Sequence, residues 1–145
     1  MALDFARRDT APALSRLLAE SAMARSALGA CGFPIAILDA GPTTRPLVYV
    51  NAAFEAYFGC RAEDVLGRGL GAAVFRGDEA MVHRMLAEST PRRTGKAWAK
   101  DGTPRPVELT ISAVRNAEGA TTHWVLAFSD RTELEQLRAE LRRAA

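Results

Sequence analysis

The sequence predicts an α+β fold: a five-stranded antiparallel sheet with short helices on one face, and a further helix at each end of the chain. Three observations predict it. Short apolar or alternating segments recur five times, two of them before residue 51 and three after residue 91. Helix-forming segments bounded by capping residues and glycines lie around and between these groups. Turn sequences rich in glycine, proline, asparagine and aspartate join the strand segments.

Length and charge are those of one ordinary globular domain. The chain has 145 residues, enough to bury a core without a metal or a disulfide. Lys and Arg number 19 and Asp and Glu number 17, and this net charge of +2 does not indicate nucleic-acid binding. No apolar run approaches the ~18 residues that span a bilayer, and the charged N-terminus does not resemble a signal peptide. We therefore expect a cytoplasmic protein without a membrane partner.

The first element is an amphipathic helix over residues 13–28. Pro12 suits its first turn, where a missing N–H costs nothing, and Gly29 ends it. Apolar side chains recur along one face at helical spacing. They are Leu14, Leu17, Leu18, Ala24 and Leu28.

Strands follow at residues 33–39 and 47–50, joined by a proline- and glycine-containing turn over residues 40–46. Asn51 then caps a short helix that ends before Gly59. A second short helix is expected over residues 62–66. The glycine-rich stretch after it, residues 67–71, is expected to be irregular.

The second half of the chain contains three strands linked by two hairpin turns. In the first turn we expect both Asp101 and Gly102 to adopt positive φ. Residues 116–119 form the second turn. The strands are expected over residues 94–100, 105–115 and 121–129.

Capping residues mark the two helices of this half. Asp78 caps a helix over residues 79–89. Asp130 and Glu133 form a capping box, in which the aspartate accepts early backbone N–H groups and the glutamate reaches back. Leucines at spacings of three and four then predict an apolar stripe on the last helix. They are Leu134, Leu137 and Leu141.

Nothing in the sequence has the spacing of a catalytic or metal-binding site. No nucleophile-elbow or H-E-x-x-H motif occurs, so we expect no enzyme activity. Cys31 and Cys60 are too few for a disulfide framework and are expected to be buried or half-buried thiols. His83 and His123 are far apart and predict no metal site.

Four motifs, in this order, resemble those of the PAS family over about residues 29–134. The resemblance implies a sheet whose inner face and short helices enclose a cavity, and a last motif that leads into an output helix. The motifs are Val48-Tyr-Val-Asn-Ala-Ala-Phe54, Phe58-Gly-Cys60 with Glu63-Asp-Val-Leu-Gly67, Lys100-Asp-Gly102 and Ser129-Asp-Arg-Thr-Glu133.

Within this family the chain looks most like the blue-light flavin branch, the LOV domains, but it departs from their signature over residues 67–74. Leu70 stands where those domains have the photoreactive cysteine. Apolar or glycine residues also replace the polar side chains that would hold a flavin, and each orphaned flavin hydrogen bond would cost about 1–3 kcal/mol. We therefore expect no flavin. The replaced positions are Gly69, Gly71, Val74, Ala97, Val107 and Phe128.

A haem-type PAS sensor would need an axial histidine on the longest internal helix. His83 lies on that helix, but Glu79 and Arg84 beside it indicate a face in water. We therefore expect no haem. The cavity implied by the PAS resemblance leaves two readings, a small apolar ligand or a core filled by its own side chains. Its expected lining is Leu70, Val74, Met85, Trp98, Val107, Leu109, Leu126 and Phe128.

We expect residues 1–29 to be a dimerisation helix, residues 30–130 the PAS domain and residues 131–145 an output helix, because one small sheet cannot bury both leucine stripes. The expected function is a homodimeric sensory module in signal transduction, which passes a packing change in its core to an effector domain or signalling partner. The alternative is a photo- or gas-sensor with flavin or haem, which visible absorbance would reveal. A weaker reading is nucleic-acid binding, against which the near-neutral charge argues. Its residues would be Arg92, Arg93, Lys96, Arg138, Arg142 and Arg143.

Overall fold

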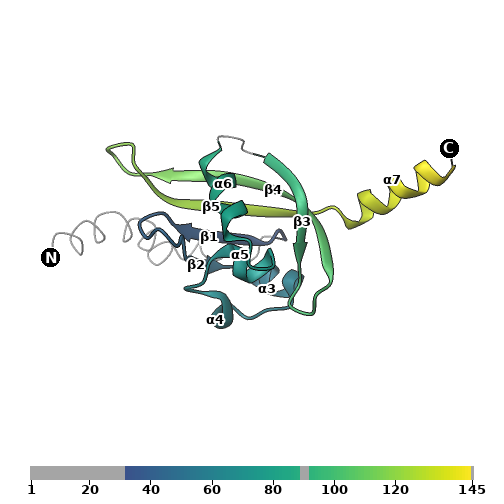
Figure 1. The fold of residues 1–145 in the computed structure, drawn as a ribbon, viewed down its shortest axis with the longest axis horizontal. Helices are drawn as coiled ribbons and strands as arrows, with labels where there is room; N and C mark the ends of the chain where they lie inside the picture. Colours follow the sequence, from purple (N-terminus) through teal and green to yellow (C-terminus); the bar gives the residue numbers. More distant parts are fainter. Residues whose placement is uncertain (1–31, 89–91, 145) are drawn as a thin grey trace.

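A computed structural model of the chain describes residues 32–88 and 92–144 and confirms the α+β fold (Figure 1). The expected helix over residues 13–28, with its leucines and Cys31, lies outside the described residues. The strands are β1 (Ile35–Asp39), β2 (Leu47–Val50), β3 (Arg92–Trp98), β4 (Pro104–Arg115) and β5 (Thr121–Asp130). The helices are α3 (Ala52–Phe58), α4 (Ala62–Val65), α5 (Leu70–Val74), α6 (Glu79–Ala87) and α7 (Thr132–Ala144).

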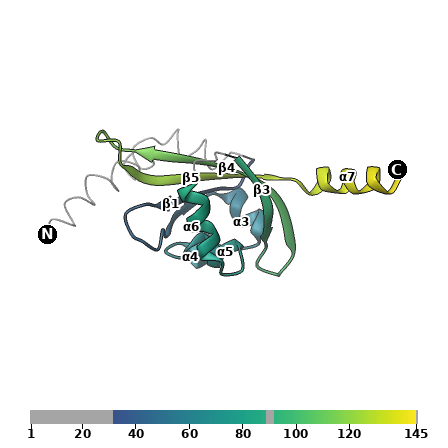
Figure 2. The same cartoon turned by 45° about the horizontal axis from the view of Figure 1, so that its top comes forward.

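The five strands form one antiparallel sheet in the order β2-β1-β5-β4-β3. The central strand is β5, which pairs with β1 through Ile37 and Val125 and with β4 through Thr110 and Ala127. Figure 2 shows α3, α4, α5 and α6 on one side of this sheet, while α7 extends away from the body beyond the end of β5. The last helix is therefore attached to the middle strand of the sheet rather than to an edge.

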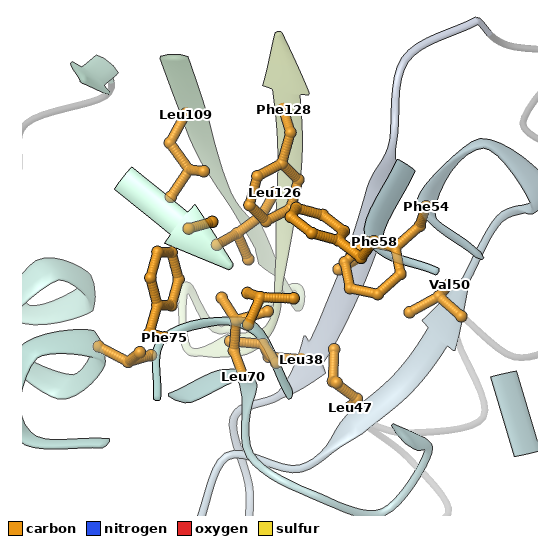
Figure 3. Packing of buried hydrophobic residues seen from close by; sticks show 14 of the residues in the cluster. Leu38, Leu47, Val50, Phe54, Phe58, Leu70, Phe75, Leu109, Leu126 and Phe128 are labelled. Atoms are coloured by element: carbon orange, nitrogen blue, oxygen red, sulfur yellow. The ribbon is translucent and has the colours of Figure 1, made fainter. Parts of the chain in front are cut away.

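Apolar side chains fill the space between the helices and the sheet (Figure 3). The rings of Phe54 and Phe58, both on α3, have centroids 4.7 Å apart, and the ring of Phe128 on β5 lies 5.8 Å from the first and 5.3 Å from the second. All three are almost fully buried. Aromatic pairs of this kind stabilise a core by about 0.5–1.5 kcal/mol each beyond their area burial.

Asn51 fixes α3 against the sheet. Its side-chain oxygen accepts hydrogen bonds from the backbone N–H of Phe54 at 3.0 Å, which caps α3, and from that of Ile35 at 2.9 Å. Its amide donates to the carbonyl of Phe33 at 3.0 Å. Gly59 ends the helix in the left-handed region at φ 65°, as expected. One predicted cap therefore also joins α3 to the first strand.

The expectation of an irregular stretch over residues 67–71 is wrong, because α5 begins within it. The carboxylate of Glu79 on α6 accepts a hydrogen bond from the backbone N–H of Ala72 at 2.7 Å. A Cβ on Gly69 would collide with that carboxylate, and one on Gly71 would collide with the backbone at the start of α6. The two glycines therefore allow α6 to approach α5 and to supply the cap that α5 lacks locally.

The turn between β3 and β4 also differs from expectation. Gly102 has φ 88°, but Asp101 does not adopt positive φ. The backbone N–H of Gly102 donates to the carbonyl of Ala99 at 2.9 Å, and the N–H of Ala99 donates to the carbonyl of Thr103 at 2.9 Å. This is a longer loop with a single left-handed glycine, which is common in hairpins. The strand before it also begins and ends earlier than expected, at Arg92 and Trp98.

Candidate functional site

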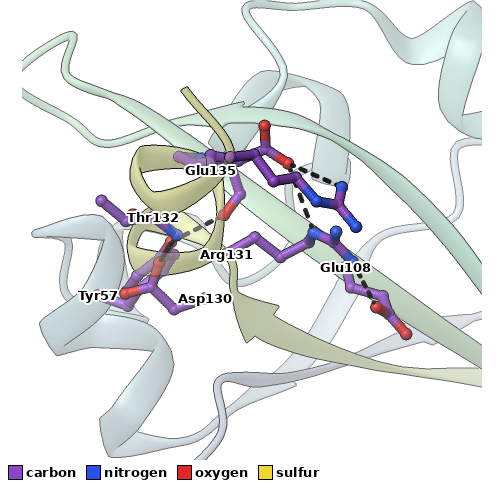
Figure 4. Close-up of polar contacts among 8 residues, drawn as sticks. Tyr57, Glu108, Asp130, Arg131, Thr132 and Glu135 are labelled. Atoms are coloured by element: carbon purple, nitrogen blue, oxygen red, sulfur yellow. Dashed lines mark hydrogen bonds and ion pairs between the residues drawn. The ribbon is translucent and has the colours of Figure 1, made fainter. Parts of the chain in front are cut away.

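Polar residues at the end of β5 join the core to α7, and we call them the junction. Figure 4 shows how they gather between α3, β4 and the start of α7. The junction consists of Tyr57, Glu108, Asp130, Arg131, Thr132 and Glu135.

Asp130 is the centre of the junction. One of its carboxylate oxygens accepts hydrogen bonds from the backbone N–H of Thr132 at 2.8 Å and from the hydroxyl of Tyr57 at 3.1 Å. The predicted bond of the aspartate to the start of the helix is therefore present. The glutamate half of the capping box was a wrong expectation: within the described residues, Glu133 makes no hydrogen bond back to Asp130. Instead, the hydroxyl of Tyr57 on α3, a distant part of the chain, donates a hydrogen bond to this carboxylate.

Burial and charge shift the pKa of both partners. Burial, the hydrogen bond to Asp130 and the negative charge of that carboxylate raise the pKa of Tyr57 to about 12. Burial alone would raise the pKa of Asp130. The hydrogen bonds from Thr132 and Tyr57 and the positive charge of Arg105 outweigh it and hold this pKa below its usual range. At neutral pH the pair is therefore a tyrosine hydroxyl donating to a carboxylate.

Arg131 fixes the first residue before α7 to the neighbouring strand. Its backbone N–H donates to the carbonyl of Pro106 at 2.9 Å, and its guanidinium donates to the carboxylate of Glu108 at 2.9 Å. A second contact, to Glu135 on the first turn of α7, is 3.8 Å long. The Arg131 side chain is 14% exposed, so its hydrogen bond to Glu108 is screened less than a surface pair. The start of α7 is thus held at two points, Asp130 and Arg131.

Beyond the junction, no described part of the chain covers α7. No residue of α7 is buried, and Leu134, Leu137 and Leu141 are 40%, 52% and 63% exposed. Acidic residues in its first turn and arginines in its last turn suit the helix dipole. These features support the helix, but they do not bury its leucine stripe.

The residues expected to line a cavity lie in the core cluster, with one exception. Trp98 is outside the cluster, and its ring lies under the guanidinium of Arg76, 4.2 Å from it. Leu70 is fully buried. The residues inside the cluster are Leu70, Val74, Met85, Val107, Leu109, Leu126 and Phe128.

The histidines and the described cysteine lie apart from one another. His83 is exposed on α6. His123 is buried in β5, where Nδ1 lies 3.1 Å from the Thr122 hydroxyl and burial lowers the pKa of the ring. Cys60 is half-buried and unpaired. Within residues 32–88 and 92–144, no group of three or more His, Cys, Asp or Glu side chains could hold a metal ion.

The sequence predicted Asp130 but missed Tyr57, Glu108 and Arg131. The tyrosine lies on α3, 73 residues before its partner, and no local pattern connects them. One signal was available: Tyr57 adjoins Phe58, whose ring it meets edge-on at 4.9 Å. A tyrosine beside a core aromatic residue often has a partner for its hydroxyl at the boundary of the core.

A family profile for the PAS fold matches residues 25–131, more than half of the chain. The chain belongs to the PAS family. In the described part of this PAS protein, no helix is both long and apolar enough to cross a membrane.

Among curated proteins, the PAS domain is similar to Adagio protein 3 from Arabidopsis thaliana, with 31% identity over 112 residues, 66% of this chain and 18% of that protein. It is also similar to an Adagio-like protein 3 from Oryza sativa subsp. japonica, with 32% identity over 61% of this chain and 16% of that protein. The chain thus spans less than a fifth of the length of these relatives.

Among solved structures, the PAS domain is similar to an RNA-binding Light-Oxygen-Voltage receptor, with a TM-score of 0.69 and 29% identity over 86% of this chain and 38% of that one. A PAS domain of an HTR-like protein from Haloarcula marismortui shares the fold, with a TM-score of 0.64 and 21% identity over 80% and 95% of the two chains. The chain is therefore a sensory domain of the PAS/LOV type, a type that is not typically enzymatic.

Proposed function

We propose that this PAS domain is a sensory and dimerisation module that passes a packing change in its core to α7. The observation that carries the proposal is a chain of direct contacts. The ring of Phe58 packs in the aromatic cluster and against Tyr57, and Tyr57 donates to Asp130, which caps α7. A signal that repacks the cluster would move Tyr57 and so change the hydrogen bonds by which Asp130 holds the start of α7. The signal must bind the two arrangements with different affinity.

The exposed leucine stripe of α7 supports a homodimer. Its spacings of three and four are those of a coiled-coil seam, and an isolated helix of this length is marginally stable in water. Pairing with a second copy would bury the stripe and stabilise the helix. The leucines expected on the N-terminal helix would add a second contact, and an effector domain or partner would read the arrangement of the paired helices.

We also propose that the domain works without flavin, although LOV domains hold one. The residues present do not fit the group. Leu70 is fully buried in the cluster, and Phe128, at a position where LOV domains have a glutamine, packs between core rings. A flavin ring here would find apolar side chains at its polar edge, at a cost of about 1–3 kcal/mol for each unpaired group.

The start of α5 is equally unsuited to a flavin phosphate. The carboxylate of Glu79 sits against Gly69 and Gly71 and accepts a bond from the N–H of Ala72. A negative charge at this place repels a phosphate, and Gly69 and Gly71 themselves offer no side chain to bind one. Around Leu70 and Phe128, these contacts favour a core filled by its own side chains over a small apolar ligand.

Sedimentation velocity of the full chain over a range of concentrations tests the proposed dimer. We expect a dimer that Leu137→Glu dissociates. Gln136→Glu adds the same charge on the exposed face beside the stripe and serves as the matched control. A wild-type monomer at all concentrations, or equal effects of the two variants, would rule out pairing through α7. An absorbance spectrum of the same sample tests the cofactor proposal, which a visible band that stays with the protein would overturn.

A further inference from the structure

A surface hollow of about 340 Å³ lies on the helical side of the molecule, apart from the junction. It is bordered by α4, α5 and the turn that joins β3 to β4. Val65, Ala72 and Ala73 form an apolar wall, and Trp98 adds an aromatic ring. Its volume is at the lower end of the range for ligand pockets, about 300–1,000 Å³, so it suits a ligand of one or two rings.

Positive charge predominates in this hollow. Arg68, Arg76 and Lys100 line it, and Asp64 is the one carboxylate among its lining residues. The distance between Lys100 Nζ and Asp64 Oδ2 is 4.0 Å, and both side chains are more than half exposed, so this pair is weak. Within the described residues, Arg68 has no ion-pair partner. Arg76 likewise has no ion-pair partner among the described residues, so two arginines line a hollow whose single carboxylate, Asp64, lies beside Lys100.

The position of Arg76 is set by unusual backbone. Its φ of 54° is in the left-handed region, which few residues other than glycine adopt, and Gly77 follows with φ 82°. This turn places the guanidinium 4.2 Å from the centroid of the Trp98 ring. A guanidinium stacked on an aromatic face keeps its N–H groups free at its edge, where they can bind a carboxylate or phosphate in a bidentate manner.

Cys60 does not alter this balance. Burial, followed by the charges of Glu55 and Asp64, raises the pKa of its thiol above the ordinary value of 9.0. At neutral pH the side chain is therefore an uncharged part of the wall rather than a thiolate.

We infer that this hollow binds a small organic anion with a flat apolar body, an aromatic carboxylate or an aromatic phosphate ester. The anionic group would bind Arg68 and Arg76, and the ring would lie against the alanines of α5 beside Trp98. Both anionic groups match the guanidinium fork, so the structure defines the shared chemistry and the titrations below distinguish the two.

The hollow is also connected to the junction. The backbone N–H of Lys100 donates to the carbonyl of Phe58 at 2.8 Å, at the end of α3 and next to Tyr57. A ligand beside Lys100 would therefore act on the helix that holds Asp130. This consequence for α7 rests on the proposed function, whereas binding in the hollow does not.

Isothermal titration of the full chain tests the binding. The probes are benzoate, 2-naphthoate and phenyl phosphate, with benzamide, benzylamine and inorganic phosphate as comparisons. We expect at least one of the aromatic anions to bind, and the neutral and cationic rings and inorganic phosphate to bind at least about tenfold more weakly, because a charged hydrogen bond and ring burial are both needed. In a Trp124→Phe background, the same anion should change the fluorescence of Trp98.

Two variants and one control locate the site. Arg68→Ala and Arg76→Asn, the latter chosen because asparagine tolerates positive φ, should each weaken binding by about tenfold or more. Arg84→Ala removes the same charge from the exposed surface of α6 and should change affinity by less than about twofold. Thermal melting verifies that each variant is folded. If Arg76→Asn unfolds, the titration of Arg68→Ala tests the site, because Arg68 is exposed.

Three results would overturn the inference: no binding of any aromatic anion at millimolar concentration, equal losses in Arg68→Ala and Arg84→Ala, or inorganic phosphate binding as tightly as phenyl phosphate. Sedimentation with and without the bound anion separates the two proposals. Binding without any change in association leaves the hollow as a ligand site and removes its link to α7. A dimer that forms through α7 while no anion binds leaves the proposed function intact and removes the ligand.

Discussion

The hydroxyl of Tyr57 donates to the carboxylate of Asp130 at 3.1 Å, and the same carboxylate oxygen accepts the backbone N–H of Thr132 at the start of α7. A core helix and the terminal helix thus share one acceptor. Loss of either donor changes the environment of the other.

Tyr57→Phe keeps the ring that packs against Phe58 and removes the hydroxyl. We expect the free energy of unfolding to fall by about 1 kcal/mol, since the lost hydrogen bond has a charged acceptor. Amide hydrogen exchange at the start of α7 should also become faster. Asp130→Ala, alone and combined with Tyr57→Phe, completes a double-mutant cycle in urea. Additive effects of the two substitutions would show that the contact contributes nothing to stability.

The ion pair of Arg131 with Glu108 should contribute more than the surface pair of Arg138 with Glu135. The first has an N–O distance of 2.9 Å and a largely buried arginine, and the second is 3.8 Å long with both side chains about half exposed. Double-mutant cycles with Arg→Met and Glu→Gln should give a coupling of about 1 kcal/mol or more for the first pair and close to zero for the second. Equal couplings would contradict the view that Arg131 anchors α7.

Gly71→Ala should destabilise the protein more than Gly69→Ala. A new Cβ at position 71 meets backbone of Asp78 and Glu79, which cannot move aside, whereas one at position 69 meets only the Glu79 side chain. We expect a loss of about 1–3 kcal/mol at position 71, although alanine favours a helix more than glycine. Chemical denaturation measures both variants. Adding Glu79→Ala should restore the stability lost in Gly69→Ala but not that lost in Gly71→Ala. If it restored the stability of both variants, the backbone of α6 would not be what sets its distance from α5.

His123 should make the protein less stable in mild acid. Burial lowers the pKa of its ring, and the charge of Asp39 opposes this only in part. The unfolded chain therefore binds the proton more readily. Stability from this residue is complete above the unfolded value of about 6.5 and is lost as the pH falls below it, by no more than about 1.4 kcal/mol per pH unit.

Urea midpoints between about pH 8 and about pH 5 test this prediction, because histidine is the side chain that titrates in that window. His123→Gln should flatten the pH profile, and His83→Gln, on the exposed face of α6, should not. A wild-type midpoint that does not change over this range would exclude a proton-linked role for the buried ring.

Elements with local signals could be predicted from the sequence, and those that depend on distant residues could not. Asn51 and Asp78 cap their helices with their own side chains, so α3 and α6 begin where the sequence indicates. The cap of α5 comes from Glu79, which follows that helix in the chain, so a run of glycines looked irregular. Apolar alternation placed Val107 and Leu109 in the core.

The candidate site was less accessible to sequence analysis for the same reason. The exposed stripe of α7 follows from leucine spacing, and Asp130 from its position before the helix. The tyrosine hydroxyl that reaches Asp130 and the carboxylate that holds Arg131 come from α3 and β4, and only the folded chain brings them together. Trp98 is predicted to line the core cavity, but Arg76, which covers its ring, adopts a positive φ that no sequence pattern marks.

The direct passage of β5 into α7 has a geometric consequence for anything joined to the far end of that helix. Each added helical residue turns the attachment point by about 100° and advances it by about 1.5 Å. Insertion of seven residues would nearly restore the original facing, to within about 20°, and move it about 10.5 Å along the axis, whereas three or four residues would leave it rotated by about 60° or about 40°. The number of inserted residues, as much as their identity, would then decide which surface of a domain fused to α7 faces its neighbour.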